Sequence, residues 1–95
     1  MEIDAFQDLM ARTYGERDRE RGIDATIAWL TEELGELARA VRKESREAQL
    51  HEIGDVLAWL ASLAAQLGLS LSEAADRYAD GCPRCGGVPC RCLNG

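Results

Sequence analysis

Proline is almost absent from this chain of 95 residues, and its two prolines, Pro83 and Pro89, both lie near the C-terminal end. Proline removes a backbone donor and breaks helices, so the long stretch without it permits uninterrupted helices. Alanine, leucine, glutamate and arginine, which favour helices, dominate that stretch. The sequence therefore predicts an all-α domain over residues 1–80 and a non-helical tail over residues 81–95.

Basic residues are also scarce, with eleven lysines and arginines against seventeen acidic residues and a net charge of −6. Phosphate backbones attract basic surfaces, so we expect no nucleic acid polymer as a partner. No apolar run approaches the roughly 20 residues of a membrane span, and the N-terminus is too acidic and polar for a signal peptide. We expect a cytoplasmic protein without membrane contact.

Apolar spacing predicts a pair of long helices joined by a turn near residues 43–46. The first, with Asp24 as its expected N-cap, carries the apolar stripe Ile27, Leu30, Leu34, Leu37 and Val41. The second carries Leu50, Ile53, Leu57, Leu60, Ala64 and Leu67, with Gly68 as a C-cap. A helix over about residues 3–19 precedes this pair, and another, capped by Ser70, runs to about Asp80.

A second stripe on each long helix carries carboxylates. An antiparallel hairpin would bring Glu36 opposite Glu52, Glu33 opposite Asp55, and Trp29 opposite Trp59. Converging carboxylates repel one another, and Mg²⁺ or Mn²⁺ relieves that repulsion because hard cations prefer oxygen ligands.

Two glycines, Gly35 and Gly54, lie among these acids and cost about 1 kcal/mol each inside a helix. We interpret them as sites of close backbone approach between the two helices. The alternative is that each acidic motif is only a solvated helix face, and the mirrored placement of acids, glycines and tryptophans favours the metal site.

The motifs Glu32-Glu33-Leu34-Gly35-Glu36 and Glu52-Ile53-Gly54-Asp55 resemble those of the MazG-like all-α nucleotide pyrophosphohydrolases. The resemblance covers about residues 3–80. It implies hydrolysis of nucleoside triphosphates between the α and β phosphates to a monophosphate and pyrophosphate. It implies that Glu33, Glu36, Glu52 and Asp55 hold Mg²⁺, while Glu32 binds a metal or orients the attacking water.

Substrate contacts are less well defined. Trp29 and Trp59 are candidates for stacking on a base, with core packing as the alternative. Family members often carry a lysine and an asparagine after the last helix. In this sequence Arg77 is the candidate for the role of the lysine and Tyr78 is a candidate substrate contact, whereas Asp80 stands where the asparagine is expected. Further arginines and lysines are possible phosphate partners, although a solvated face explains them as well: Arg39, Arg42 and Lys43, and, toward a neighbouring subunit, Arg17 and Arg21.

Cysteine is missing from the helical region, and all four cysteines lie in the tail: Cys82, Cys85, Cys90 and Cys92. Four thiolates suit tetrahedral Zn²⁺ in a structural site, with iron, a flexible reduced tail or a disulfide as the alternatives. The single histidine, His51, is expected to be exposed or packed rather than a metal ligand.

Two hypotheses remain for the function: a Mg²⁺-dependent pyrophosphohydrolase, or a non-catalytic helical interaction module with a zinc-bound tail. A di-iron bundle is disfavoured because its Glu-x-x-His pairs are missing. Apolar positions left over on the second long helix, Val56, Ala61 and Leu63, predict a homodimer with a four-helix core, or a tetramer. The preferred base and sugar do not follow from the sequence.

Overall fold

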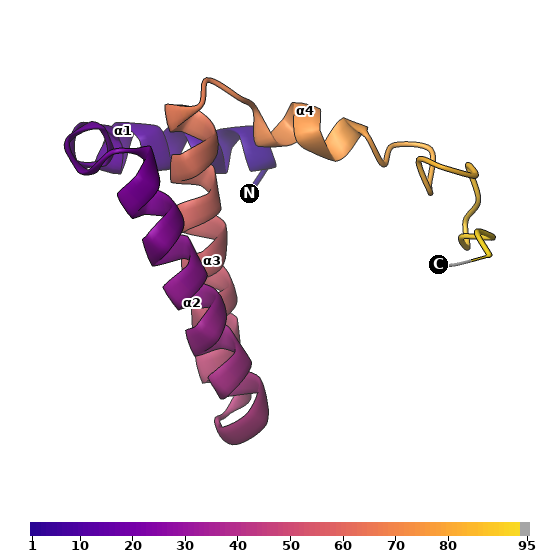
Figure 1. Cartoon of the computed structure of the whole chain (residues 1–95), viewed down its shortest axis with the longest axis horizontal. Helices are drawn as coiled ribbons and strands as arrows, with labels where there is room; N and C mark the ends of the chain where they lie inside the picture. The colour runs from indigo at the N-terminus through magenta and orange to yellow at the C-terminus, as the bar shows by residue number, and fades with distance from the viewer. Residues whose placement is uncertain (94–95) are drawn as a thin grey trace.

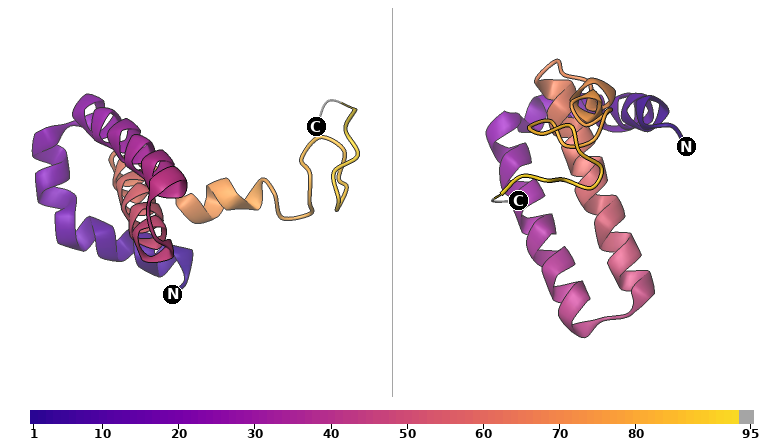
Figure 2. Two further views of the ribbon diagram at one scale, coloured as in Figure 1. Left: turned by 90° about the horizontal axis from the view of Figure 1, so that it is seen from below. Right: turned by 90° about the vertical axis from the view of Figure 1, so that its right-hand side faces the viewer.

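The computed structural model describes residues 1–93, and within them it contains four α-helices and no strand. These are α1 (Ile3–Arg21), α2 (Ile23–Lys43), α3 (Arg46–Gln66) and α4 (Leu71–Asp76). Helices α2 and α3 lie side by side as an antiparallel hairpin, and α1 crosses the open end of that hairpin (Figure 1). Helix α4 and the tail lead away from it (Figure 2). The predicted all-α hairpin with flanking helices is confirmed.

The turn between α2 and α3 consists of Glu44 and Ser45, as the lapse in apolar spacing predicted. The Glu44 amide still donates to the Ala40 carbonyl, which closes the last turn of α2. Ser45 then caps α3, because its hydroxyl accepts a hydrogen bond of 3.2 Å from the Ala48 amide. This short connection leaves α2 and α3 no alternative to antiparallel packing.

The junction between α1 and α2 is tighter than the sequence suggested. Gly22 alone separates the two helices, with a φ of 87° that side chains rarely adopt. Its amide donates to the Asp18 carbonyl, and its carbonyl accepts from the Thr26 amide, so one residue ends α1 and begins α2. The prediction of Asp24 as N-cap was therefore wrong, and Asp24 lies inside the first turn.

Helix α3 ends at Gln66 with Leu67 as its C-cap, so the predicted C-cap, Gly68, lies one residue further on, where it is left-handed with a φ of 71°. The Leu69 amide donates to Ala64 and the Gly68 amide to Ala65, the paired bonds of a Schellman motif. Ser70 caps α4 by accepting a hydrogen bond from the Glu73 amide.

Helix α4 is shorter than expected, since it ends at Asp76 and continues only as turns to Asp80. Side chains from Glu73 to Asp80 are all exposed. Without an apolar face to bury, a short helix is not stabilised beyond its first turns.

The buried core is small and lies where α1 crosses α3. Ala61, Ala64 and Leu71 are buried there, with Phe6 and Met10 of α1 packed against them. Ala61 is fully buried, so the prediction that it is left over for a partner was wrong. A chain this short buries little apolar surface by itself.

Most residues of the two apolar stripes predicted on α2 and α3 lie outside this buried core. Seven of these residues form what we call the apolar hairpin face and are exposed by 38% to 70%: Ile27, Leu34, Val41, Leu50, Ile53, Leu57 and Leu60. In both helices each of these residues directly follows one that faces the other helix, such as Glu33 before Leu34 and Trp59 before Leu60. The same rotation of about 100° on two antiparallel helices leads to the same side, so the two stripes form one surface.

None of the helices in the described part of the chain combines the length and the apolar character needed to cross a membrane.

Candidate active site

Two tryptophans set the register of the hairpin. The rings of Trp29 on α2 and Trp59 on α3 are stacked, with their centroids 5.9 Å apart and their planes 12° from parallel. This confirms the predicted pairing of Trp29 with Trp59. Since each acidic motif lies one helical turn from a tryptophan on the same stripe, the stacked rings also place the acids of α2 beside those of α3.

Glu33 of α2 lies among the acids of both helices. Its partial burial is the largest cause that raises its pKa above the usual range, followed by the charges of Asp55 and Glu52 on α3 and then that of Glu36. Glu33 is therefore within electrostatic reach of the acids on α3 and of Glu36, and the convergence of all four carboxylates on one metal stays a prediction. A site that resists ionisation of its own acids favours a bound cation.

Glu52 supplies the clearest sign of a missing partner. Its Oε2 atom is buried, and among the described residues no group hydrogen-bonds to it. A buried carboxylate oxygen without a partner is costly, because it has lost its hydration. Oxygen donors such as these are the ligands of Mg²⁺, so the residues present fit that ion.

Asp55 is held by its neighbour on α3, His51, whose Nε2 atom lies 3.3 Å from Asp55 Oδ2. Ligand atoms of His51, Glu52 and Asp55 all lie within 4.8 Å of one another. The histidine is exposed, as predicted, but sequence reasoning missed its contact with an acid. The spacing of four residues on a helix was the signal that could have found it.

The other acids and the glycines are more open. Glu32 and Glu36 are both exposed on α2. A Cβ atom on Gly35 or Gly54 would meet no atom of the facing helix within 4 Å. The prediction that these glycines mark close approach of α2 to α3 was therefore wrong, because both lie on exposed sides of their helices.

The ring of Trp59 has a second neighbour, on the side of α1. The guanidinium carbon of Arg21 lies 4.7 Å from its ring centroid, a cation–π contact. Arg21 is itself held by an ion pair of 2.6 Å with Asp18, whose side chain is almost fully buried. Trp29 and Arg21 therefore both pack on the ring of Trp59. Trp29 itself remains 46% exposed.

A cavity of about 240 Å³ opens between α1 and α3 beside Arg21 and Trp59. Asp55 and Trp59 belong to its lining, and so do Arg17 and Arg21. These two arginines thus face a cavity of their own chain, whereas the sequence suggested a neighbouring subunit. Both arginines belong to an unbroken run of charged residues over 16–21, and that run gave no sign of which members are buried.

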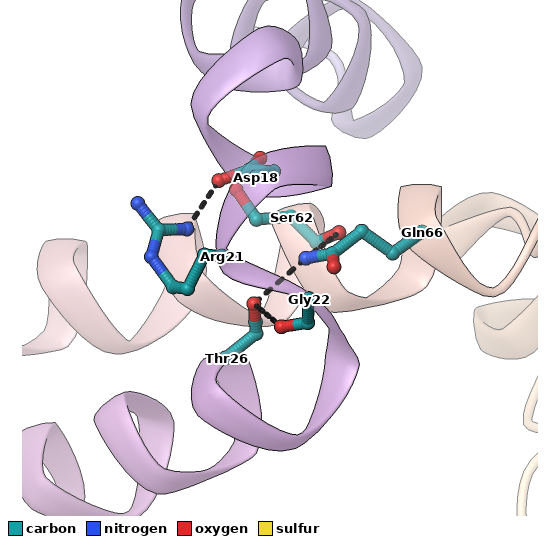
Figure 3. Close-up of polar contacts among 6 residues, drawn as sticks. All are labelled: Asp18, Arg21, Gly22, Thr26, Ser62 and Gln66. Atoms are coloured by element: carbon teal, nitrogen blue, oxygen red, sulfur yellow. Dashed lines mark hydrogen bonds and ion pairs between the residues drawn. The ribbon is translucent and has the colours of Figure 1, made fainter.

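A polar network, also unforeseen, ties the α1–α2 junction to the end of α3 (Figure 3). Thr26, fully buried, donates to the Gly22 carbonyl at 2.9 Å and accepts from Gln66 Nε2 at 2.8 Å. A buried hydroxyl that both donates and accepts is satisfied, and it fixes how α1 and α2 meet α3. This fixes the position of Arg21, which immediately precedes Gly22.

Comparison of the sequence with known protein families identifies the domain that contains these acids. Residues 21–84 match the MazG nucleotide pyrophosphohydrolase domain. The chain belongs to this MazG family. The match contains α2, α3 and both acidic motifs, whereas most of α1, which lines the cavity with Arg17, lies before it.

A relative of this MazG domain is the "Uncharacterized protein YpjD" of Bacillus subtilis (strain 168), 48% identical over 63 residues. The alignment covers 56% of this chain and 57% of the relative, so the chain spans little more than half of that protein's length.

Arg77 and Tyr78 lie apart from the MazG acids. They follow α4 on the segment that leads away from the hairpin, and both are exposed (Figure 1). Arg77 donates a hydrogen bond of 2.7 Å to the Tyr78 hydroxyl. Within one chain the structure therefore brings neither residue to the acid cluster.

The four cysteines lie mostly beyond the MazG match, and the structure brings them together. All four Sγ atoms lie within 4.8 Å of one another. Backbone amides of Cys85 and Arg84 lower the pKa of Cys82 to about 6, while contacts with the Cys90 and Cys82 thiols raise the pKa of Cys92 to about 11. Four sulfur atoms this close fit a single cation, which would take the place of the thiol protons.

Proposed function

We propose that the chain is a Mg²⁺-dependent enzyme that hydrolyses nucleoside or deoxynucleoside triphosphates between the α and β phosphates, as nucleotide-pool housekeeping in the cytoplasm. The single observation that carries the proposal is the buried, unpartnered Oε2 of Glu52 beside Glu33, whose pKa is raised by its acidic neighbours. Membership of the MazG family supplies the reaction class.

Four carboxylates are assigned to the metal: Glu33, Glu36, Glu52 and Asp55. They come from both helices of the hairpin and are hard oxygen donors, which suit Mg²⁺ or Mn²⁺. The cysteines, as soft ligands, suit Zn²⁺ and form a separate site in the tail. His51 keeps Asp55 oriented through the contact of 3.3 Å rather than replacing it as a ligand.

Bound Mg²⁺ would neutralise phosphate charge and acidify a coordinated water molecule. In the reaction the water oxygen bonds to the α phosphorus, the bond from that phosphorus to the bridging oxygen breaks, and pyrophosphate leaves. Glu32, exposed next to Glu33 on α2, is assigned to orient this water. The same position allows it to accept the proton that the water loses.

In this proposal the phosphates and the base of the substrate contact different residues. Arg17 and Arg21 line the cavity next to Asp55, where they are placed to contact phosphate oxygens. Trp29, with one side of its ring stacked on Trp59 and 46% of the residue exposed, offers its other side to a base. Trp59 has Arg21 and Trp29 as neighbours and also lines this cavity, so it supports the stack and borders the phosphate site.

A homodimer is part of the proposal, because the apolar hairpin face has no partner within the described chain. Val41 and Leu50 are exposed by 63% and 70%, unusually high for aliphatic residues on one continuous surface. Pairing two hairpins through this face makes a four-helix core. Arg77 and Tyr78 reach an acid cluster only if it belongs to a second copy.

The deciding experiment is a panel of the common nucleoside and deoxynucleoside triphosphates with Mg²⁺, assayed for pyrophosphate and monophosphate. We expect pyrophosphate release by the wild type and a loss of roughly a hundredfold or more in Glu52→Gln, which keeps the shape but not the charge of a metal ligand. Glu47→Gln is the matched control, because Glu47 is an exposed acid in the first turn of the same helix.

Release of single phosphates instead of pyrophosphate would refute the assigned bond cleavage. If the wild type is inert on the whole panel, the alternative of a non-catalytic interaction module is favoured. Equal activity in Glu52→Gln and Glu47→Gln would show that the carboxylate cluster is not the site.

A further inference from the structure

The cysteine tail has the dimensions of a site for one tetrahedral ion. Cys82 Sγ lies 3.7 Å from Cys92 Sγ and 3.6 Å from Cys90 Sγ. With metal–sulfur bonds of about 2.3 Å, a tetrahedron of sulfurs has edges of about 3.8 Å. A cluster of several metal atoms would hold its thiolates further apart, because the ligands then lie outside a larger core. The sulfur spacing therefore indicates a mononuclear site.

Backbone amides orient the sulfurs in this site. Cys85 Sγ accepts from the Gly87 amide at 3.4 Å and from the Arg91 amide at 3.3 Å. Cys90 Sγ accepts from the Cys92 amide at 3.4 Å. Such bonds stabilise thiolate charge and aim the ligands, which is the role of outer contacts in metal sites.

Gly87 lies where the tail backbone passes close to a cysteine sulfur. A Cβ atom there would lie 2.6 Å from the Pro89 carbonyl oxygen and 3.3 Å from Cys85 Sγ. Any side chain would push the backbone away from the sulfur to which it donates. The glycine is thus required by the geometry of the thiolate cage and not by a turn alone.

The tail is also self-contained. Within the part of the chain that the structure describes, the hydrogen bonds of residues 82–92 all join members of that segment, such as the Gly86 amide to the Cys82 carbonyl at 2.7 Å. The left view of Figure 2 shows the segment leading away from the hairpin. From Gly81 onward it contains Arg84 and Arg91 and no acidic residue, which suits the charge of −2 on one divalent ion with four thiolates.

We propose that residues 82–92 are an independent zinc module, in which one Zn²⁺ held by Cys82, Cys85, Cys90 and Cys92 orders the tail without stabilising the helical domain. Zinc is preferred over Fe²⁺ because thiolate sites bind it more tightly. All four positions of the ion are filled by protein, so the site is structural. A short segment without a core owes its fold to the metal.

The test uses the full chain, purified under reducing conditions and analysed for zinc and iron by mass spectrometry. We expect about one zinc per chain, and a fall of roughly tenfold or more in the double variant Cys82→Ser/Cys85→Ser. Trypsin supplies a second readout, because Arg84 and Arg91 lie inside the module: cleavage there should be slow with zinc and fast after chelation or in the variant.

Two further variants and one spectrum complete the test. Gly87→Ala should weaken zinc binding by roughly tenfold, whereas Leu93→Ala, a fully exposed neighbour, should leave it unchanged. Helical circular dichroism and its melting midpoint should be the same with and without zinc.

The proposal is overturned by an absence of bound zinc, by one equivalent of iron in its place, by a zinc content that survives the double substitution, or by loss of the helices on chelation. Pyrophosphate release does not enter this test, so its failure would leave the proposed enzyme activity untouched, and the converse also holds.

Discussion

Replacing Glu33 with glutamine tests the carboxylate cluster without any assumption about the substrate. The pKa of Glu33 is raised in the folded protein, first by burial and then by Asp55, Glu52 and Glu36. Between its ordinary and its raised pKa the folded state therefore binds more protons than the unfolded state. Stability falls as pH rises through that window, and the full penalty is present above it. Glutamine mimics the protonated acid and removes the penalty.

The scale of the effect is taken from the repulsion between the two acids of α3 that raise the pKa of Glu33. Ligand oxygens of Glu52 and Asp55 lie within 4.8 Å of each other. Two charges at that distance repel by about 3.5 kcal/mol at an effective dielectric constant of about 20. The Asp55 side chain is 42% exposed, so solvent screening reduces this substantially. On this scale we expect metal-free Glu33→Gln to be more stable than the wild type at neutral pH by about 1 kcal/mol, or roughly 4 to 8 °C in melting temperature.

Magnesium should reverse that order. At a concentration 100 times the dissociation constant, binding stabilises the wild type by about 2.7 kcal/mol. A variant that binds tenfold more weakly would gain only about 1.4 kcal/mol. The assay is thermal unfolding with and without MgCl₂ at matched ionic strength, near pH 4 and at neutral pH, with Glu47→Gln as control.

The reasoning is refuted if Glu33→Gln is the less stable protein without metal at neutral pH, or if magnesium stabilises wild type and variant equally. A destabilised variant would mean that Glu33 is held by favourable contacts and not repelled by its neighbours. Equal shifts would mean that the ion binds elsewhere.

Further predictions concern the supports of the site and its partner surface. Trp59→Ala should lower the free energy of unfolding by about 2 kcal/mol in chemical denaturation. Trp29→Ala should lower the free energy of unfolding less, and in steady-state kinetics it should raise KM for the triphosphate severalfold. Thr26→Val removes the acceptor of Gln66 and should cost about 1 to 2 kcal/mol; a neutral result in urea melts would show that the network is not structural. Val41→Glu places a charge on the apolar hairpin face and should convert a dimer to a monomer in analytical ultracentrifugation, and a wild type that is already monomeric would contradict the proposed dimer.

Much of the hairpin could be predicted because its signals are local. The turn at Glu44 and Ser45 follows from a lapse in apolar spacing, and the end of α3 follows, to within one residue of the C-cap, from Gly68. The pairing of Trp29 with Trp59 follows from helical periodicity once a short antiparallel turn is assumed. Each of these depends on residues close in sequence or on one geometric rule.

The errors share a different cause. Whether Ala61 is buried depends on where α1 crosses α3, and no local pattern contains that information. The same holds for the open space around Gly35 and Gly54. A periodic apolar stripe shows that a face avoids water, but not whether its cover comes from the same chain or another.

The sequence by itself determined which residues are candidates for the chemistry: five acids in two motifs, two tryptophans one turn away, and four cysteines confined to the tail. Residue type and helical spacing suffice for that, because both are set along the chain. The tertiary structure decided which of them meet and what surrounds them. It buried one oxygen of Glu52, placed Arg21 over Trp59 and left the apolar hairpin face uncovered, because burial depends on how α1, α2 and α3 pack in space.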